Sequence, residues 1–563
     1  MTWRKRRAII IILLILFFVV LLWIARRPGH LSSNQILVMD VEGQIDEQSS
    51  FNFPGALVGE TTPVLHDYLD AIDSAASDSR ITGLVLRIAP LETGWSKLEE
   101  MRAHLLAFQK SGKPSICYLG YDGVGNPEYY LASACDKVWL VPTDPVNIKG
   151  LMAEALFFRG TLDKLKIVPQ FFHTGPFKTA TNMFTEKKFT PEHREEVQSL
   201  LGSIYGQYLS DTAQARHMDR AKFESFVTSG PLLPSEALQD GIVDRLAYWD
   251  QVQDYFKDRR GWNPVTLDRY RAFLSDDGIG ADKVAVVYAT GMIVSGESDT
   301  SPGGGFVMGG DSVASDIRSA RQDSSIKAII LRVDSGGGSV VASEVIRREM
   351  ELAREVKPVV VSMSDVAASG GYWISVPANK IVAEPNSITG SIGVLTGKLN
   401  ISGLYNLLGM STDYVATSDN ATLFSEQQNF TPAQQAYMEK SIQDIYSQFT
   451  KGVSEGRGMP VKAVEAIAQG RVWSGTQAKT LGLVDELGGL DQAIEVAKDL
   501  AKIPASERVN LVRLPKEENF FEWLVKRDTN GVSESRWLES LERRLGSMSN
   551  TVQARIPYEL HIR

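Results

Sequence analysis

The sequence predicts an α/β protein built by tandem duplication and preceded by one transmembrane helix. Three features indicate this: an uninterrupted apolar run near the N-terminus, a long internal repeat, and an alternation of β-rich runs with helical patterns inside each repeat. The 563 residues are 43% hydrophobic and 23% charged, which is ordinary globular usage. A chain of this size and composition can therefore build hydrophobic cores without metal or disulfide cross-links.

The apolar run covers residues 8–25 and contains 18 residues without a charge. At ~1.5 Å per residue, a helix of this length reaches about 27 Å, near the lower limit for a membrane span. The alternative is a cleavable signal peptide, but Trp23–Ala25 leads directly into Arg26 and Arg27 instead of a small-residue cleavage site. More basic residues precede the run than follow it, which predicts a cytoplasmic N-terminus and a body outside the cytoplasm. Residues 1–30 are therefore predicted to be a cytoplasmic stub with an uncleaved anchor.

An internal repeat organises the rest of the chain. Four pairs of segments match in the same order: Ile36–Gly43 with Val284–Gly291, Ile81–Ile88 with Ile326–Val333, Tyr129–Leu131 with Tyr372–Ile374, and Ala237–Asp244 with Ala478–Asp485. The spacing between partners drifts only slightly, as small loop insertions would produce. We expect a first repeat at 31–265, a linker at 266–281, a second repeat at 282–505 and a C-terminal extension at 506–563.

Each repeat alternates strand-length apolar runs with helical patterns. Leu84–Ile88 and Ile329–Val333 have the length of buried strands, whereas Ser343–Arg354 and Gln434–Phe449 have helical patterns. This alternation predicts parallel strands in an α/β fold. The extension carries aromatic and leucine residues, partly at helical spacing, which either pack on the chain's own body or contact another subunit: Phe520, Phe521, Trp523, Trp537, Leu538, Leu541 and Leu545.

Charge and cysteine content exclude several classes of function. The net charge is −9, although residues 1–30 contain six basic residues and no acidic one, so the body is strongly acidic. An acidic body argues against binding of a nucleic-acid backbone. The two cysteines, Cys117 and Cys135, are too few for a cysteine-rich zinc site or a disulfide framework. They are interpreted as two buried thiols, with one disulfide as the alternative.

The second repeat holds the densest cluster of residues suited to catalysis. Ser369 lies between small residues shortly after the predicted strand Val359–Met363, so its hydroxyl can be presented without obstruction. The Gly370 amide would lie at a helix N-terminus, and a glycine loop after a neighbouring strand can offer a second amide, which together would form an oxyanion hole. The alternative is that these glycines only make tight turns. No Gly-Lys-Ser/Thr follows, which excludes a P-loop. The cluster consists of Asp334–Ser339, Ala367–Trp373 and Thr389–Gly393.

A serine nucleophile needs a base, and the histidines limit the choice. The chain has seven histidines, and none lies between residues 218 and 560. A Ser-His-Asp triad formed within the second repeat is therefore excluded. The base is either a histidine from the first repeat or a lysine, and the segment His173–Ala180 supplies one of each, His173 and Lys178. A lone lysine is usually a solvated surface residue, so the residues alone leave this choice open.

The ordered motifs Asp-Ser-x-Gly-Gly-Ser, Ala-Ala-Ser-Gly-Gly-Tyr-Trp and Gly-Ser-Ile-Gly resemble those of the signal peptide peptidase A family, also called protease IV. The anchor, the duplicated body and the motif spacing are similar to the family's long bacterial form. The resemblance implies a Clp/crotonase-like fold and a Ser-Lys dyad, which is a recognised alternative to the triad. Two positions differ from the usual family pattern: Gly336 replaces a proline and Thr179 replaces a serine.

The resemblance assigns roles to individual residues. It implies that Ser369 is the nucleophile, that Lys178 is the general base, and that Ser391 hydrogen-bonds this lysine. Gly338 and Gly370 are the implied oxyanion donors. An exposed lysine is almost fully protonated at neutral pH, so the base needs apolar surroundings. Phe177 and Phe184 are the expected walls.

The internal repeat adds an independent expectation about the site. Ser369 aligns with Asn126 in the first repeat, and Lys178 aligns with Ser418 or Asp419 in the second. Each half therefore has only one member of the dyad. The first half is expected to supply the base and the second half the nucleophile with its oxyanion hole.

The resemblance implies a membrane-anchored serine endopeptidase that degrades cleaved signal peptides on the periplasmic side of the bacterial inner membrane, with misplaced membrane proteins as a second substrate class. It also implies a homotetramer with no metal or cofactor. Two other functions remain to be weighed. An acyl-CoA hydratase or isomerase would share the fold, but an exported body does not fit soluble cytoplasmic thioesters. A non-catalytic assembly platform would keep the fold without the activity.

Overall fold

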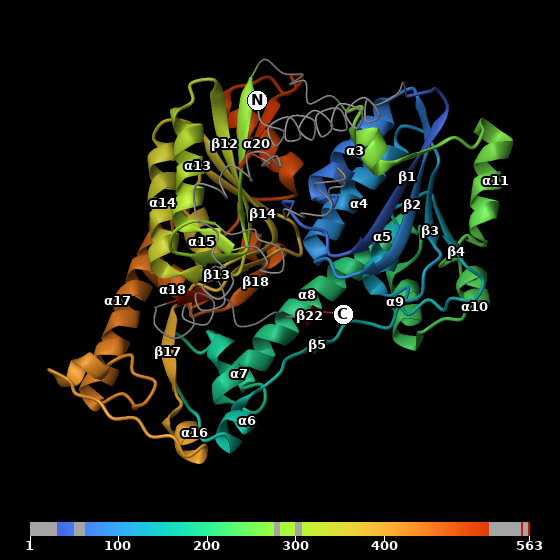
Figure 1. Cartoon of the computed structure of the whole chain (residues 1–563). Coiled ribbons are helices and arrows are strands. Elements are labelled where there is room, and N and C mark those ends of the chain that lie inside the picture. The colour runs from blue at the N-terminus through green and yellow to red at the C-terminus, as the bar shows by residue number, and fades with distance from the viewer. Residues whose placement is uncertain are drawn as a thin grey trace, which may run out of the picture.

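The computed structural model describes residues 31–49, 62–274, 282–298, 307–516, 553–555 and 561–562 (Figure 1). Among these residues, no helix combines the length and the apolar character that crossing a membrane requires. The predicted anchor at 8–25 and the extension's aromatic residues between 520 and 545 lie outside the described residues. Both predictions are therefore untested by the fold.

The first half contains a six-stranded sheet in the order β7-β4-β3-β2-β1-β8, and all its pairs are parallel. Its strands are β1 (Gln35–Gly43), β2 (Ile81–Leu91), β3 (Ser115–Leu119), β4 (Lys137–Leu140), β7 (Arg245–Leu246) and β8 (Pro264–Thr266). Its helices are α3 (Leu65–Ser77), α4 (Trp95–Gln109), α5 (Asn126–Ala132), α8 (Pro191–Ala215), α9 (Arg220–Ser229), α10 (Pro234–Gln239), α11 (Trp249–Arg260) and α12 (Leu267–Arg271). The predicted strand at 84–88 is confirmed as the centre of β2.

The second half repeats this arrangement strand for strand. The order β19-β15-β14-β12-β9-β20 is again fully parallel, and β16 and β18 extend the sheet beside the end of β14. The strands are β9 (Lys283–Thr290), β12 (Ile326–Ser335), β14 (Val359–Ala368), β15 (Lys380–Ala383), β16 (Ile388–Gly390), β18 (Val472–Ser474), β19 (Glu486–Leu487) and β20 (Asn510–Leu514). The helices are α13 (Gly310–Gln322), α14 (Val340–Arg354), α15 (Gly370–Ser375), α17 (Pro432–Arg457), α18 (Val461–Ile467), α19 (Gly475–Thr480) and α20 (Leu490–Ala501).

Equivalent side chains make equivalent contacts in the two halves, which supports the duplication beyond the strand order. In the first half, Arg216 pairs with Asp244, and the Tyr129 hydroxyl donates to the Ile242 carbonyl at 2.7 Å. In the second half, the matching residues do the same: Arg457 pairs with Asp485, and the Tyr372 hydroxyl donates to the Leu483 carbonyl at 2.9 Å. The predicted duplicated α/β fold is therefore confirmed.

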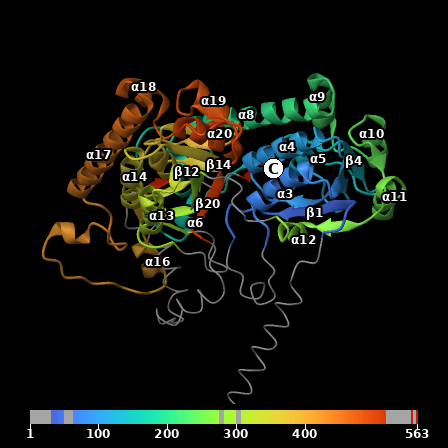
Figure 2. The ribbon, with the colours of Figure 1, turned by 90° about the horizontal axis from the view of Figure 1, so that it is seen from above.

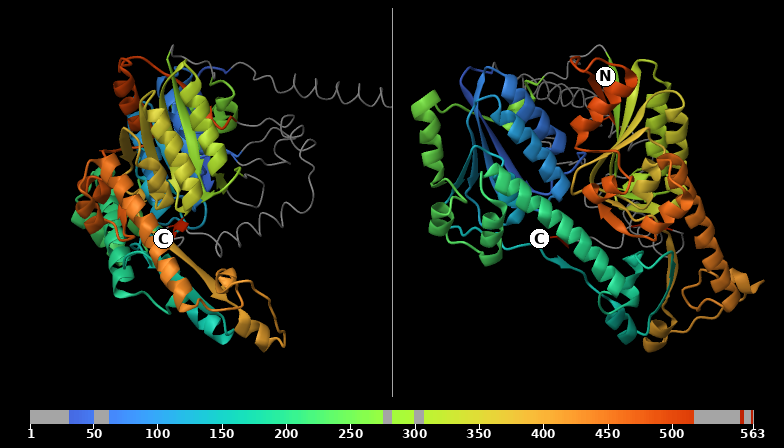
Figure 3. Two further views of the ribbon diagram at one scale, coloured as in Figure 1. Left: turned by 90° about the vertical axis from the view of Figure 1, so that its left-hand side faces the viewer. Right: turned by 180° about the vertical axis from the view of Figure 1, so that it is seen from behind.

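A third sheet joins the two halves and runs into an arm that projects away from the main sheets (Figures 1 and 3). Its order is β11-β10-β13-β21-β17-β6, so the first-half strand β6 pairs antiparallel with β17 of the second half. The elements of this sheet and the arm are β6 (Val168–His173), β10 (Met292–Val294), β11 (Val307–Gly309), β13 (Gly337–Ser339), β17 (Leu395–Asn400), β21 (Gln553–Arg555), α6 (Arg159–Lys164), η1 (Thr179–Thr181), α7 (Asn182–Thr185), α16 (Ser402–Leu407) and η2 (Asp419–Thr422). A separate two-stranded pair joins β5 (Ala153–Glu154) to β22 (His561–Ile562).

Two predicted boundaries differ from the folded units. The segment assigned to the linker begins with α12, whose Leu267 and Tyr270 are buried in the first-half core. The segment assigned to the extension begins with β20, which pairs in parallel with β9 as β8 pairs with β1. The sequence comparison missed this last strand of the repeat because three-residue and five-residue edge strands carry little pattern. The second repeat therefore continues to 514.

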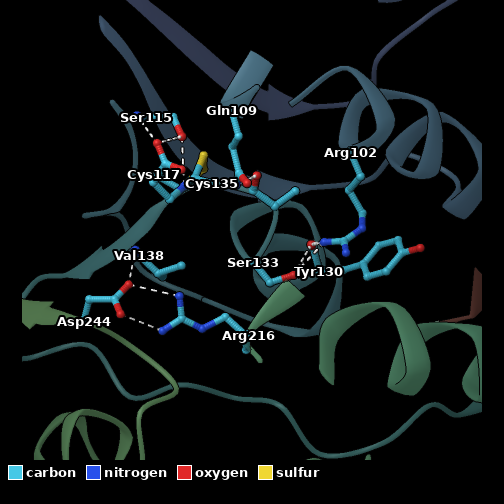
Figure 4. Close-up of a disulfide and its surroundings, with 12 residues drawn as sticks. Arg102, Gln109, Ser115, Cys117, Tyr130, Ser133, Cys135, Val138, Arg216 and Asp244 are labelled. Carbon is cyan, nitrogen blue, oxygen red and sulfur yellow. Dashed lines mark hydrogen bonds and ion pairs between the residues drawn. A yellow bond between two sulfur atoms is a disulfide. The ribbon is translucent and has the colours of Figure 1, made fainter. Parts of the chain in front are cut away.

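The two cysteines form a disulfide, so the preferred interpretation as free thiols is wrong. Cys117 on β3 is bonded to Cys135, which follows α5 (Figure 4). Both belong to the buried core of the first half. The sequence alone could not decide this, because residues 18 positions apart are brought together only when α5 turns back onto the sheet.

Helix α8 connects the halves (Figure 2). It lies across both of them and contacts β18 of the second half. Ser203 on α8 lies 2.7 Å from Ser474 between the two hydroxyl oxygens, and Gln477 donates to the Ser199 hydroxyl at 3.1 Å. These contacts fix the first-half segment that precedes α8, which contains Lys178, against the second half.

Candidate active site

Ser369 lies at the sharp turn between β14 and α15, in the second half. Its φ is 55°, a region that a non-glycine residue rarely adopts. The turn is held on both sides, because the Ser369 amide donates to the Gly390 carbonyl at 2.8 Å and its carbonyl accepts from the Trp373 amide at 2.8 Å. A strained turn at a strand-to-helix junction is a feature that functional residues often show. The Ser369 side chain is fully buried.

The glycine loop lies against this turn, as the sequence predicts. Ser335 pairs with Ala367, two residues before Ser369, and a Cβ on Gly371 would lie 2.5 Å from the Ser335 carbonyl oxygen. Gly338 pairs with Ile293 of β10, where a Cβ would lie 2.1 Å from a backbone oxygen, so only glycine fits. Gly370 is the first residue of α15, where free amides favour negative charge. Both predicted oxyanion donors thus come from loops that pack together beside Ser369.

Lys178 reaches this turn from the first half. Its Nζ lies 2.7 Å from the Ser369 Oγ, although the two residues are 191 positions apart. Nζ also donates to the Ser391 carbonyl and to the Ser391 Oγ, both at 3.0 Å. The structure therefore brings together three of the five predicted site residues through direct hydrogen bonds. A neutral amine has two N–H groups and one lone pair, so the two bonds to Ser391 leave the lone pair for the Ser369 hydroxyl.

Burial sets the protonation of Lys178. Desolvation lowers the pKa of its amine to about 7, while the charge of Glu196 acts in the opposite direction. The side chain is fully buried, and among the described residues no carboxylate forms an ion pair with it, so little compensates a positive charge. A lysine with a pKa of about 7 is neutral in a substantial fraction of molecules at physiological pH, as a general base requires.

Backbone at two glycines lies against the stem of Lys178, whereas the rings of the expected walls Phe177 and Phe184 contact Arg471 and Phe171. A Cβ on Gly470 would lie 2.5 Å from the Lys178 Cβ, and a Cβ on Gly393 would lie 3.2 Å from its Cδ. Phe184 instead stacks on Phe171, with ring centroids 5.6 Å apart. Glycines therefore allow the second-half chain to approach the lysine stem closely and exclude water from it.

Ser391 is fixed by the segment that also contacts Lys178. Its amide donates to the Arg471 carbonyl at 2.7 Å and its hydroxyl donates to the Gly470 carbonyl at 3.2 Å. Since the Ser391 hydroxyl hydrogen is used in this way, its oxygen remains an acceptor for the lysine. A chain of hydrogen bonds therefore runs from Lys178 through the Ser391 hydroxyl to the Gly470 carbonyl, as the predicted lysine-orienting role requires.

Glu196 is a site residue that the sequence did not reveal. This buried carboxyl group on α8 accepts from the Val472 amide at 2.7 Å and from the Thr179 hydroxyl at 3.3 Å. Burial raises its pKa to about 8, which the hydrogen bond from Val472 partly opposes. Glu196 therefore connects Thr179, the residue after Lys178, to Val472 in β18. No local motif marks it, because glutamate on a long helix is ordinarily a solvated residue.

Lys97 is a second contact between the halves that the sequence did not reveal. Its Nζ lies 2.8 Å from Asp334 and 3.2 Å from Asp365, both measured to carboxylate oxygens. Asp334 directly precedes the glycine loop, and Asp365 lies four residues before Ser369. The amides of Ser96 and Lys97 also donate to Asp365, each at 3.1 Å. The start of α4 therefore holds the two strand ends from which the site is built.

The other candidates occupy different places. His173 is exposed, and its Nδ1 lies 3.0 Å from the carbonyl oxygen of Gly175 in its own turn. Asn126, which aligns with Ser369, donates to the Gly150 carbonyl and accepts from the Lys149 amide. Ser418 and Asp419, the two residues that align with Lys178, are both exposed, unlike the buried Lys178.

Comparison with known proteins identifies the family. The sequence model of peptidase family S49 matches twice, at residues 107–262 and 351–504, which together exceed half of the chain. The chain belongs to peptidase family S49. It is 36% identical to the chloroplastic serine protease SPPA of Arabidopsis thaliana over 490 residues, which is 85% of this chain and 71% of that protein.

Two bacterial relatives extend the comparison. The chain is 36% identical to protease 4 of Salmonella typhi, over 83% of this chain and 78% of that protein. It is 33% identical to protease 4 of Haemophilus influenzae, over 84% of this chain and 80% of that protein. These relatives and the twofold family match identify the protein as a serine peptidase with a duplicated S49 domain, as the sequence motifs predicted.

Among solved structures, a ClpP1 mutant from Listeria monocytogenes matches 36% of this chain and 91% of its own, with 17% sequence identity and a TM-score of 0.25. This score is too low to establish a common fold. The duplicated α/β architecture rests on the sheets described above, and the Clp/crotonase-like assignment stays a prediction.

Proposed function

We propose that the protein is an endopeptidase with a Ser-Lys dyad, in which Ser369 is the nucleophile and Lys178 is its base. The observation that carries this proposal is the 2.7 Å contact between the Lys178 Nζ and the Ser369 Oγ in a fully buried setting. The neutral amine would accept the hydroxyl proton while Oγ attacks the peptide carbonyl. The amides of Gly338 and Gly370 would stabilise the oxyanion, and the protonated lysine would then deliver its proton to the leaving amine.

Covalent labelling of the nucleophile tests this assignment. The purified full-length chain is incubated with a serine-reactive fluorophosphonate and digested, and the modified residue is located by mass spectrometry. The label is expected on Ser369 in the wild type and nowhere in a Ser369→Ala variant. A label on any other serine, with Ser369 unmodified, would contradict the assignment. It would also leave the hydratase and platform alternatives open, since neither needs an activated serine.

We propose further that residues 8–25 anchor the body to the bacterial inner membrane and that it degrades cleaved signal peptides on the periplasmic side. The apolar run and its flanking basic residues support the anchor. Apolar peptides released in the membrane suit an active site tethered beside it, and a relative 32% identical over 188 residues is named a putative signal peptide peptidase. Replacing residues 1–30 by a cleavable signal peptide should move the protein from the membrane fraction to the soluble periplasmic fraction.

We also propose that the protein assembles as a homotetramer, and the strand pairing in the arm supports this proposal. Within one chain, β17 accepts β6 as an antiparallel partner over six residue pairs. The repeat places the equivalents of these strands at 154–159 and 409–414, and apolar side chains are exposed in or beside both segments: Met152, Leu156, Met410, Tyr414 and Val415. The same pairing is therefore available between the first half of one copy and the second half of the next. A head-to-tail contact of this kind closes into a ring when the rotation closes.

A further inference from the structure

A strand from the far end of the chain lies beside the helix that begins directly after Ser369. In the third sheet, β21 lies between β13 and β17. Gly337, Gly338 and Ser339 pair antiparallel with residues 555, 554 and 553, and Leu395 pairs antiparallel with residue 553. Without β21, this sheet would divide into β11-β10-β13 and β17-β6, each with an edge facing the gap. A three-residue backbone segment therefore fills the space between two strand edges.

Those two edges belong to the site itself. The first wall, β13, contains the predicted oxyanion donor Gly338, and the second wall, β17, begins four residues after Ser391. β21 also contacts α15, the helix that begins directly after Ser369. An extended peptide that adds a strand to an exposed edge is a common mode of peptide recognition, in which main-chain hydrogen bonds supply the affinity. β21 thus lies where this mode would place a peptide substrate.

A second contact holds the same end of the chain. β22 pairs antiparallel with β5, with residue 561 opposite Glu154 and residue 562 opposite Ala153. β5 belongs to the first half and β13 to the second, so the C-terminal residues are attached to both halves. A segment tethered at this distance reaches a high effective concentration at the groove without strong contacts of its own.

We propose that the C-terminal segment containing residues 553–555 binds the chain's own peptide groove and competes with substrate. This inference rests on the proposed function, since it assigns the groove to peptide binding. A substrate must displace β21 before its carbonyl can reach Ser369. The apparent affinity for substrate is therefore reduced by the fraction of molecules in which the groove is free.

The direct test measures binding, so that it does not depend on catalysis. A fluorescent synthetic peptide with the sequence of residues 549–558 is titrated against two Ser369→Ala chains, one full-length and one ending at Lys516. Fluorescence anisotropy should show binding to the shortened chain and at least roughly 10-fold weaker binding to the full-length chain. A peptide of scrambled order is the control. Equal affinity for both chains, or no affinity for either, would overturn the proposal.

A second variant guards against misfolding of the shortened chain. Ala554→Pro keeps the full length but removes a backbone N–H and fixes φ in the middle of β21, which disfavours strand pairing. In a Ser369→Ala background it should bind the peptide as the shortened chain does, whereas Ser533→Pro should behave as the full-length parent. Failure of Ala554→Pro to increase binding would count against the proposal.

Measurements of peptide cleavage distinguish the failure of this inference from the failure of the proposed function. With Ser369 intact, the shortened chain and Ala554→Pro should cleave an unstructured apolar peptide with a KM lowered roughly 10–100-fold and kcat nearly unchanged. If the full-length chain and both variants share one KM, the tail does not compete, although Ser369 can still be the nucleophile. If peptide binding is as expected but no chain cleaves or labels at Ser369, the dyad assignment fails and the groove assignment stands.

Discussion

The two halves of the molecule share one strand order, but the equivalent strands β3 and β14 end differently. β3 has five residues and stops at Leu119, whereas β14 has ten residues and continues to Ala368 beside β16 and β18. The three-pair β16–β18 ladder is reduced to the single bridge Val146–Leu232 in the first half. The extension places Ser369 directly after the C-terminal end of β14. The difference teaches that two repeats with one strand order can end equivalent strands in different local structures, and only the second ends in the Ser369 turn.

The turn that corresponds to the Ser369 turn has a structural role in the first half. Asn126 donates to the Gly150 carbonyl at 2.8 Å, and its oxygen accepts from Tyr208 at 3.4 Å. Its amide side chain therefore connects α8 to the loop at Lys149 and Gly150, whose counterpart in the second half contains Ser391. The two turns have the same place in the fold, but one is filled by internal hydrogen bonds and the other is completed by a side chain from the opposite repeat.

The largest effect is expected from substitutions at the two aligned turns, which contain Ser369 and Asn126. Ser369→Ala should lower kcat by at least about 10⁴-fold while leaving the thermal unfolding curve nearly unchanged, because only the attacking oxygen is lost. Introducing Asn126→Ser into this variant should not restore activity, since the side-chain partners of Asn126 among the described residues are the Gly150 carbonyl, the Lys149 backbone amide and the Tyr208 hydroxyl, none of which is a lysine amine. Steady-state hydrolysis of an unstructured apolar peptide measures both. Recovery in the double variant would show that the first half can form a site by itself.

Lys178 tests the other member of the divided pair. Lys178→Arg keeps the positive charge but cannot act as a base near neutral pH, so it should be as inactive as Lys178→Ala, at least about 10³-fold below wild type in kcat. His173→Gln should retain most activity, because His173 is exposed and bonds only its own turn. The same peptide assay gives the three values. An inactive His173→Gln beside an active Lys178→Arg would indicate a Ser-His enzyme.

Substitution of Lys97 tests whether the first half positions the second-half strand ends at Asp334 and Asp365. Lys97→Met should lower kcat roughly 10–100-fold, since loss of the pairs to Asp334 and Asp365 lets both strand ends shift. Lys113→Met is the matched control: its Nζ bonds two carbonyls within the first half, at Ala75 and Asp78, and does not touch the site. Stopped-flow acylation rates and unfolding curves are compared. Equal loss of activity in both variants would mean general destabilisation.

The smallest expected effect concerns pH. Since the pKa of Lys178 is lowered to about 7 by burial, kcat/KM should rise with pH through about 7 as the amine loses its proton. Glu196→Gln keeps an acceptor for Val472 and removes the Glu196 carboxylate, which favours the protonated lysine. Because burial raises the pKa of Glu196 to about 8, few molecules carry this charge near pH 7, so the acid limb should move to lower pH by less than roughly half a unit. Glu195→Gln, which pairs only with the exposed side of Arg471, is the control. An acid limb that moves to higher pH would contradict this electrostatic role.

Much of the site was predictable because its parts are local in sequence. The glycine loop, the Ser369 turn and the Ser391 segment each follow a strand, and parallel strands end at the same edge of a sheet, so their order along the chain predicts their meeting. The pairing of Lys178 with Ser369 came from family resemblance, since the residues alone left His173 equally available. Glu196 and Lys97 had no local signal, because each acts through contacts with the opposite half.

The sequence by itself determined the duplication, the α/β class and the positions of the special turns, because periodicity and glycine placement are properties of short segments. Only the tertiary structure decided the role of α4, whose charged side chains predict a solvated face. Five of them are buried instead, because the helix lies between the two halves: Lys97, Glu99, Glu100, Arg102 and His104. Glu100 pairs with Arg332 of the second half at 2.6 Å, which compensates both buried charges. A helix buried on both sides by polar contacts leaves no periodic pattern, so its environment follows only from how the two repeats pack.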